Sequence, residues 1–288
     1  MKRREIVVGV DGSPASQAAL VWASAEAVRR GCELTVLYAY DWHVIGARAP
    51  IGGPLAEDAR RRAEELVAAA VAEARAAAPQ LVVHGKALLG AAGPTLVAAA
   101  EPAELVVVGS RGRGGFASLL LGSVSQQVAT HAHTPVVVVR GRPDPIGPIV
   151  VGVDGSGPAH EALGVAFEEA GFRHTGIVAV RVYTVPMAWS TDLTPFFEDY
   201  EARRRFELEA LIEDLAPWQA KYAETPVEPI VVEGHAAGTL TGLSHTAQLV
   251  VAGTRGHGGF GGLLLGSVSL QLLHHAECPV LIARPSAT

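Results

Sequence analysis

The stretch Ile6-Val-Val-Gly-Val-Asp-Gly-Ser-Pro14 decides how this chain folds. Residues 6–10 form a continuous apolar run rich in β-branched side chains, which is typical of a strand covered on both faces. Ser13 and Pro14 then have the residue types of a helix N-cap and of a first helical position. The stretch therefore predicts a buried strand, a short turn and a helix, in that order.

The same stretch returns later in the chain as Ile149-Val-Val-Gly-Val-Asp-Gly-Ser156. Two further segments return in the same order, Leu105-Val-Val-Val-Gly-Ser-Arg-Gly112 as Leu249-Val-Val-Ala-Gly-Thr-Arg-Gly256 and Leu119-Leu-Leu-Gly-Ser-Val-Ser125 as Leu263-Leu-Leu-Gly-Ser-Val-Ser269. The copies lie 143 or 144 positions apart throughout. Such a constant offset indicates that a whole domain has been duplicated.

The two copies are separated by Gly141-Arg-Pro-Asp-Pro-Ile-Gly-Pro148. Three prolines and two glycines in eight residues cannot continue a helix or a central strand. We therefore expect a first domain over residues 1–140, a linker over 141–148 and a second domain over 149–288.

Strand and helix patterns alternate within each copy. In the first copy, strands are predicted at 6–10, 34–40, 82–89, 105–108 and 135–140, and helices at 15–30, 55–78, 95–100 and 123–131. This order predicts an α/β fold in which each domain has a parallel, doubly wound sheet with helices on both faces.

The composition narrows the classes of function. The chain has 288 residues, 49% of them hydrophobic, and a formal net charge of −6, which argues against a protein that coats nucleic acid. Its two cysteines lie in opposite halves, so neither a disulfide framework nor a zinc site is expected. The apolar run 6–10 is too short for a signal peptide, and no stretch is long enough to span a membrane. We expect a cytoplasmic protein that binds neither nucleic acid nor membrane.

A glycine-rich motif follows the fourth predicted strand. It reads Gly109-x2-Gly112-x9-Gly122-Ser123 and is repeated as Gly253-x2-Gly256-x9-Gly266-Ser267. Glycines that adopt conformations closed to other residues can direct successive backbone N–H groups at an anion, and the start of the following helix also favours negative charge. The motif has neither the lysine of a Walker loop nor the position of a Rossmann fingerprint. A single copy would favour a glycine turn with a helix cap over a phosphate site, but both copies keep the spacing to Gly-Ser and both follow an apolar strand.

An aspartate ends the first predicted strand of each copy, Asp11 and Asp154. The carboxyl ends of the strands at a topological switch point are where doubly wound sheets bind ligands. A carboxylate there can accept a hydrogen bond from a ribose hydroxyl, an adenine amine or a metal-bound water. The alternative is an Asx turn or a helix cap without a ligand.

Together these motifs resemble the universal stress protein family over nearly the whole chain. The resemblance implies a Rossmann-like domain of the adenine nucleotide alpha hydrolase-like type, with a five-stranded parallel sheet of order 3-2-1-4-5. It also implies that ATP, with Mg²⁺, is held between the first and fourth strands. The implied contacts in the first copy are Gly9, Val10, Asp11 and the backbone of Ala39 on the adenine side, and Gly109, Ser110, Arg111, Gly112, Arg113, Gly115, Gly122, Ser123, Val124 and Ser125 on the phosphate side. In the second copy they are Gly152, Val153, Asp154, Val182, Gly253, Thr254, Arg255, Gly256, Gly259, Gly266, Ser267, Val268 and Ser269.

The two copies differ within the loop, and two histidine pairs could be taken for metal ligands. Arg113 becomes His257 in the second copy, which removes a fixed positive charge and suggests that the two sites differ in affinity. The pairs His131/His133 and His274/His275 fall at the ends of predicted helices, where a histidine complements the helix dipole, so we expect no metal site there.

Three classes of function are compatible with these motifs. The favoured one is an ATP-binding regulator of stress response or growth that acts on an unidentified protein partner. The alternatives are a slow ATPase or phosphotransferase and a scaffold that does not use nucleotide. No Walker lysine and no second carboxylate beside Asp11 recur in both copies, so we expect no catalytic residues. The apolar final strands 135–139 and 279–283 predict that the domains associate through them and that the chain forms a homodimer.

Overall fold

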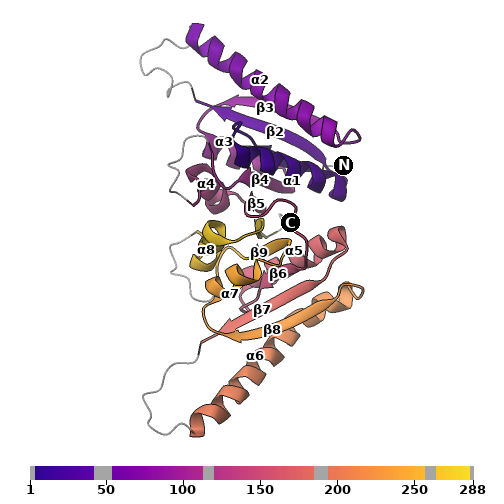
Figure 1. Ribbon diagram of the computed structural model, residues 1–288, viewed down its shortest axis with the longest axis vertical. Coiled ribbons are helices and arrows are strands. Elements are labelled where there is room, and N and C mark those ends of the chain that lie inside the picture. The colour runs from indigo at the N-terminus through magenta and orange to yellow at the C-terminus, as the bar shows by residue number, and fades with distance from the viewer. Residues whose placement is uncertain (1–3, 42–53, 113–119, 185–193, 257–263, 286–288) are drawn as a thin grey trace. The chain divides into compact units, whose positions relative to one another are not determined.

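The computed structural model describes residues 4–41, 54–112, 120–184, 194–256 and 264–285. It divides into two compact units, of which the first ends at Pro143 and the second comprises Asp144–Pro285. Each unit is an α/β domain, and the two repeat the same succession of elements (Figure 1).

In the first domain, strands and helices alternate along the chain. The strands are β1 (Glu5–Gly9), β2 (Glu33–Tyr40), β3 (Val83–Leu89), β4 (Leu105–Gly109) and β5 (Val136–Val139), and the helices are α1 (Pro14–Arg30), α2 (Pro54–Ala77), α3 (Ala92–Ala100) and α4 (Ser123–His131). The strand order is β3-β2-β1-β4-β5 and every pairing is parallel. Helix α1 packs beside α2, and α3 packs beside α4.

The second domain repeats this arrangement. Its strands are β6 (Ile149–Gly152), β7 (Ile177–Tyr183), β8 (Val227–Glu233), β9 (Leu249–Ala252) and β10 (Val280–Ile282), and its helices are α5 (Gly157–Arg173), α6 (Thr194–Lys221), α7 (Ala236–Leu243) and α8 (Ser267–His275). The strand order is β8-β7-β6-β9-β10, again parallel throughout. The predicted order 3-2-1-4-5 is therefore confirmed in both domains.

The quoted stretch folds as its residue types require. The β1 residues 6–9 are fully buried, as expected of a central parallel strand. Ser13 has extended backbone angles (φ −80°, ψ 157°) and its side chain accepts a hydrogen bond from the Ser16 N–H, so it is the N-cap of α1. Helix α1 ends at Gly31, which is left-handed with φ 64°.

One helix begins earlier than predicted. The pattern places a helix at 95–100, after Pro94, whereas α3 already begins at Ala92. Pro94 lies in the first turn, where the missing N–H has no helical partner in any case and proline is tolerated. No side chain caps this helix, which is why the sequence gives no sign of its true start.

Candidate functional site

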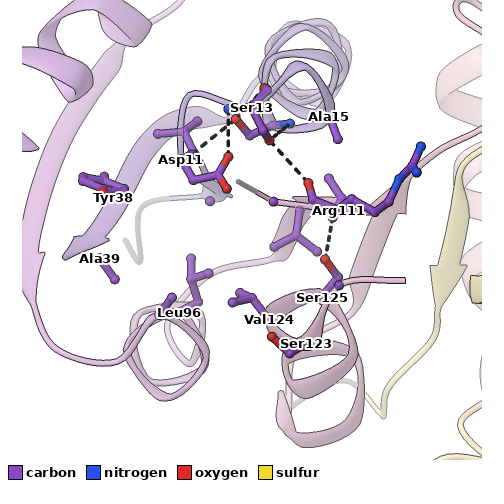
Figure 2. A pocket seen from close by; sticks show the side chains of 18 of the residues that line it. Asp11, Ser13, Ala15, Tyr38, Ala39, Leu96, Arg111, Ser123, Val124 and Ser125 are labelled. Carbon is purple, nitrogen blue, oxygen red and sulfur yellow. Dashed lines mark hydrogen bonds between the residues drawn. The ribbon is translucent and has the colours of Figure 1, made fainter. Parts of the chain in front are cut away.

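The first domain has a cavity of about 630 Å³ at the carboxyl ends of β1 and β4 (Figure 2). In the order 3-2-1-4-5 these adjacent strands form the topological switch point, where the loops diverge to opposite faces of the sheet. The cavity is lined by Gly9, Val10, Asp11, Ser13, Pro14, Ala15, Ser16, Leu37, Tyr38, Ala39, Ala92, Leu96, Val108, Gly109, Arg111, Gly112, Leu121, Gly122, Ser123, Val124 and Ser125.

Asp11 lies in this cavity between the start of α1 and the glycine-rich loop. Its Oδ1 atom accepts a hydrogen bond from the Ser13 N–H at 2.9 Å, so the Asx-turn interpretation is correct for this oxygen. Its Oδ2 atom lies beside Gly112, where a Cβ atom would come within 2.5 Å of it. The carboxylate therefore both shapes the turn and lines the cavity.

Ser13 joins the start of α1 to the glycine-rich loop. Its Oγ atom accepts from the Ser16 N–H at 3.2 Å and donates to the Arg111 carbonyl at 3.3 Å. Figure 2 shows this hydroxyl between the helix and the loop. The sequence identifies Ser13 as a helix cap, but its second role, holding the loop, depends on a contact 98 residues away.

The glycines of the loop do not supply the unusual backbone conformation predicted for them. We expected left-handed backbone, but φ at Gly109, Gly112 and Gly122 lies outside that region. Gly109 is required because a Cβ atom would lie 2.5 Å from the backbone of Ala15. The left-handed glycine is Gly12, with φ 76°, which turns the chain between Asp11 and the helix cap.

Helix α4 begins at the edge of the cavity, directly after Gly122. The Gly122 N–H donates to the Ser110 carbonyl at 2.8 Å, and the Ser125 hydroxyl donates to the Gly109 carbonyl at 2.5 Å. The first N–H groups of a helix have no helical acceptor, so those of Ser123, Val124 and Ser125 are available to an anion. Ser110 does not line the cavity, and its carbonyl instead fixes the position of Gly122.

The second domain has a smaller cavity, of about 270 Å³, at the corresponding place. It is lined by Gly152, Val153, Asp154, Ala159, Val180, Val182, Ala236, Leu240, Ala252, Gly253, Arg255, Gly256, Gly266, Ser267, Val268 and Ser269. The loop is held in the same way, because the Gly266 N–H donates to the Thr254 carbonyl at 2.7 Å and the Ser269 hydroxyl to the Gly253 carbonyl at 2.7 Å. Thr254, like Ser110, does not line its cavity.

The N-cap serine differs between the domains. Ser156 donates its hydroxyl to Asp154 Oδ1 at 2.6 Å, whereas its counterpart Ser13 donates to the loop. Gly155, between Asp154 and Ser156, is left-handed with φ 79°, like Gly12. The turn is therefore the same in both domains, but the hydrogen bond to the loop is specific to the first.

Most of the predicted site residues come together. Every one that is described lines its cavity except Ser110 and Thr254. Arg113, Gly115 and Gly259, together with His257, lie outside the described residues. The residues that the sequence reasoning missed come from the start of α1 or α5, from the strands β2, β4, β7 and β9, from α3 or α7, and from the segment before α4. They are Ser13, Pro14, Ala15, Ser16, Leu37, Tyr38, Ala92, Leu96, Val108 and Leu121, and Ala159, Val180, Ala236, Leu240 and Ala252.

Two arginines, Arg255 and Arg284, lie near each other at the loop of the second domain. Burial, and then the proximity of the Arg255 guanidinium, lower the pKa of Arg284 to about 10. Arg284 follows β10, so a second arginine lies near the glycine-rich loop. Neighbouring cations suit a site for an anion.

The described residues contain no group of three or more His, Cys, Asp or Glu side chains that could hold a metal ion. His131, His274 and His275 lie in the last turns of α4 and α8, as predicted. Nor does the described part of the chain include a helix long and apolar enough to cross a membrane.

The fold and the clefts define a tandem, doubly wound α/β protein with one cavity per domain, each lined by a glycine-rich loop and the start of a helix. The universal stress protein family model matches residues 2–140 and 145–284. The chain belongs to this family.

Relatives support the assignment over the full length. A universal stress protein of Mycobacterium tuberculosis (strain H37Rv) is 38% identical over 99% of this chain and 98% of its own length, and another from the same strain is 37% identical over 98% and 97%. A solved universal stress protein from Archaeoglobus fulgidus covers 97% of this chain and 96% of its own, with a TM-score of 0.72 and 19% identity.

Proposed function

We propose that the protein is an ATP-binding regulator and that each domain has one ATP site. The observation that carries the proposal is the convergence, in one cavity, of an unpartnered helix start, an arginine and a carboxylate. In the first domain these are the N–H groups of residues 123–125, Arg111 and Asp11. The first two favour phosphate and the third accepts hydrogen bonds from a nucleoside.

The first cavity has the size that this ligand requires. Its volume of about 630 Å³ lies within the range of roughly 300–1,000 Å³ that is usual for small-molecule sites. Ala39 lies across the cavity from Arg111 (Figure 2). Together with Gly9 and Val10, which also line the cavity, it offers an apolar surface that suits a flat base. The phosphates would then lie against Gly112 and Gly122, where the absence of side chains allows close approach.

Magnesium is compatible with these donors as a companion of ATP. Mg²⁺ in nucleotide sites takes most of its ligands from phosphate and water and one or two from the protein. Among the described lining residues of the first cavity, Asp11 is the carboxylate and Ser123 a hydroxyl that would hold the ion. The ion would supply charge neutralisation for the phosphates.

A regulatory role is favoured over catalysis by what lines the first cavity. The described lining contains one carboxylate and one arginine, with neither a lysine nor a histidine. Hydrolysis needs a group that orients or deprotonates the attacking water, and Asp11 already accepts a hydrogen bond from the backbone of Ser13. We therefore propose that ATP is a bound signal, read by a protein partner in the cytoplasm, and that hydrolysis is slow or absent.

The test is to identify and titrate the ligand. Purified protein is denatured and the released small molecules are chromatographed, and nucleotide-free protein is titrated with ATP in a calorimeter. We expect released adenine nucleotide and saturation at two ATP per chain. Protein that releases no nucleotide and shows no binding of ATP would refute the proposal.

A further inference from the structure

The two cavities match on the side proposed for the nucleoside and differ next to the glycine-rich loop. The matching residues are Gly9, Val10, Asp11 and Ala39 in the first domain and Gly152, Val153, Asp154 and Val182 in the second. The residues that line the first cavity and whose counterparts do not line the second are Ser13, Pro14, Ala15, Tyr38 and Leu121. All but Tyr38 lie at the start of α1 or directly before Gly122, so the lining that the second domain lacks is mainly on the phosphate side. The second cavity is also the smaller, at about 270 Å³ against about 630 Å³.

The start of α1 adds a hydrogen-bond donor to the first cavity. Ser13 and the loop are in contact, because the Ser13 hydroxyl donates to the Arg111 carbonyl at 3.3 Å. Ala15, the second residue of α1, also lies against the loop, since a Cβ atom on Gly109 would be 2.5 Å from its backbone. Figure 2 shows Ser13, Ala15 and Arg111 on one side of the cavity and Ala39 on the other. An N–H group in the first turn of a helix has no acceptor within the helix, so the Ala15 N–H is available to an anion.

The second domain has a proline in place of this donor. Helix α1 begins with Ser13-Pro-Ala-Ser16 and α5 with Ser156-Gly-Pro-Ala159, so Pro158 stands at the position of Ala15. The backbone approaches the loop in the same way, because a Cβ atom on Gly253 would lie 2.6 Å from the Pro158 carbonyl oxygen. Proline has no N–H group, however. The start of α5 therefore offers the second cavity no donor at this position.

We propose that the Ala15 N–H makes the first site select nucleotides with a long phosphate chain, whereas Pro158 leaves the second site unable to distinguish ATP from AMP. The inference rests on the proposed ATP binding and deepens it. Each phosphate beyond the first adds negative charge that needs donors, and a hydrogen bond to a charged group contributes about tenfold or more in affinity. The first site then holds ATP, and the second holds ATP or AMP according to their relative concentrations.

The test compares ATP with AMP, which has the same nucleoside and a single phosphate. Gly266→Glu leaves the first site available and Gly122→Glu leaves the second, and both variants are titrated with each nucleotide by calorimetry. We expect the first site to prefer ATP by at least about tenfold, and the second to bind the two nucleotides within about threefold of each other.

An exchange of the helix starts tests the role of Ala15. In the Gly266→Glu background, Pro14→Gly with Ala15→Pro gives α1 the Ser-Gly-Pro start of α5. We expect the affinity for ATP to fall about tenfold and the affinity for AMP to stay within about threefold, because only the added phosphates lose a donor. Gln17→Ala is the control and should leave the ratio unchanged, since Gln17 lies in the first turn of α1 but does not line the cavity. Thermal unfolding establishes that each variant is folded.

The reverse exchange should create selectivity in the second site. In the Gly122→Glu background, Gly157→Pro with Pro158→Ala restores an N–H group at the second position of α5. Proline suits the first helical position, and nothing lies within 4 Å of the Gly157 Cβ position. We expect the preference for ATP over AMP to rise by at least about threefold.

The outcomes separate the two claims. The same ratio of affinities at both single-site variants overturns the inference and leaves the proposed function standing, as does a second site that binds neither nucleotide or distinguishes them by more than about threefold. A folded exchange variant that keeps the ratio of its parent also overturns it. If neither site binds ATP, the proposed function fails and the inference falls with it. The comparison of the single-site variants remains decisive even if the exchange variants do not fold.

Discussion

Replacing Gly122 with glutamate would test the phosphate site most directly. Gly122 has φ −78° and ψ 151°, angles that any residue adopts, and a Cβ atom there would meet its nearest neighbours at 3.4–3.6 Å, which is ordinary contact. The fold should therefore tolerate the substitution. The new carboxylate would lie at the start of α4, in the place proposed for phosphate.

The expected loss of affinity follows from charge and space together. Two like charges about 4 Å apart repel by about 4 kcal/mol at the effective dielectric constant of a partly buried site. The carboxylate can also accept hydrogen bonds from the first N–H groups of α4 and so competes for the donors that phosphate would use. A net loss of about 4 kcal/mol corresponds to about a thousandfold in affinity for ATP at the first site.

The assay is calorimetric titration of Gly122→Glu with ATP, with thermal unfolding as the measure of fold. Gly122→Ala is the matched control, because it adds the Cβ atom without charge and should lose less than about tenfold. Gly266→Glu should remove the second site alone, since that glycine has the same geometry (φ −73°, ψ 159°). Retention of two ATP per chain in folded Gly122→Glu protein would refute this assignment of the phosphate site.

Three further outcomes are expected. Gly109→Ala should lower the free energy of unfolding by about 1–3 kcal/mol, because its Cβ atom would lie 2.5 Å from the Ala15 backbone. Gly171→Ala is the control and should be neutral or stabilising, because nothing lies within 4 Å of its Cβ position. Equal effects of the two substitutions in denaturant titrations would contradict the packing role of Gly109. Burial, and then the Glu104 carboxylate, raise the pKa of the Cys32 thiol to about 11, so the stability that the protonated thiol contributes is complete below about pH 8.5 and is lost as the pH rises towards 11. Cys32→Ala should therefore flatten the fall in the free energy of unfolding over this pH range. Rapid alkylation of Cys32 in native protein at pH 8 would show that the thiol is accessible and contradict this expectation. Light scattering should give the mass of a homodimer, and a monomer at micromolar concentration would count against it. Steady-state assays should give a turnover well below about one ATP per second, and a faster turnover that is lost in Asp11→Ala would count against the regulatory role.

Much of the fold was predictable because the duplication doubles every local signal. The apolar run 6–10, the Ser13-Pro14 cap and the same features at 149–158 each indicate one strand and one helix start, and their order leaves few arrangements of a parallel sheet. The start of α3 was missed because proline and glycine in its first turn look like a loop.

The site was predictable where a residue type implies its chemistry, as for Asp11 and Gly122. It was not predictable where the role depends on contacts between distant segments. Gly109 was expected to supply an unusual backbone conformation, but it is there to let β4 approach α1. Tyr38 lines the first cavity, whereas Arg181, at the same strand position of the second domain, pairs with Glu207 and Asp214 of α6.

The hydrogen bonds that hold the loop in the first domain bear on the thermodynamics of binding. The carbonyls of Ser110 and Arg111 are already engaged, by the Gly122 N–H and the Ser13 hydroxyl, before any ligand arrives. A loop end that is ordered in advance loses little conformational entropy on binding, so more of the contact energy remains as affinity. The second domain uses its serine hydroxyl on Asp154 instead, so ordering of its loop end should cost more when the ligand binds. Calorimetry of the two single-site variants should therefore give the first site the less unfavourable entropy of binding.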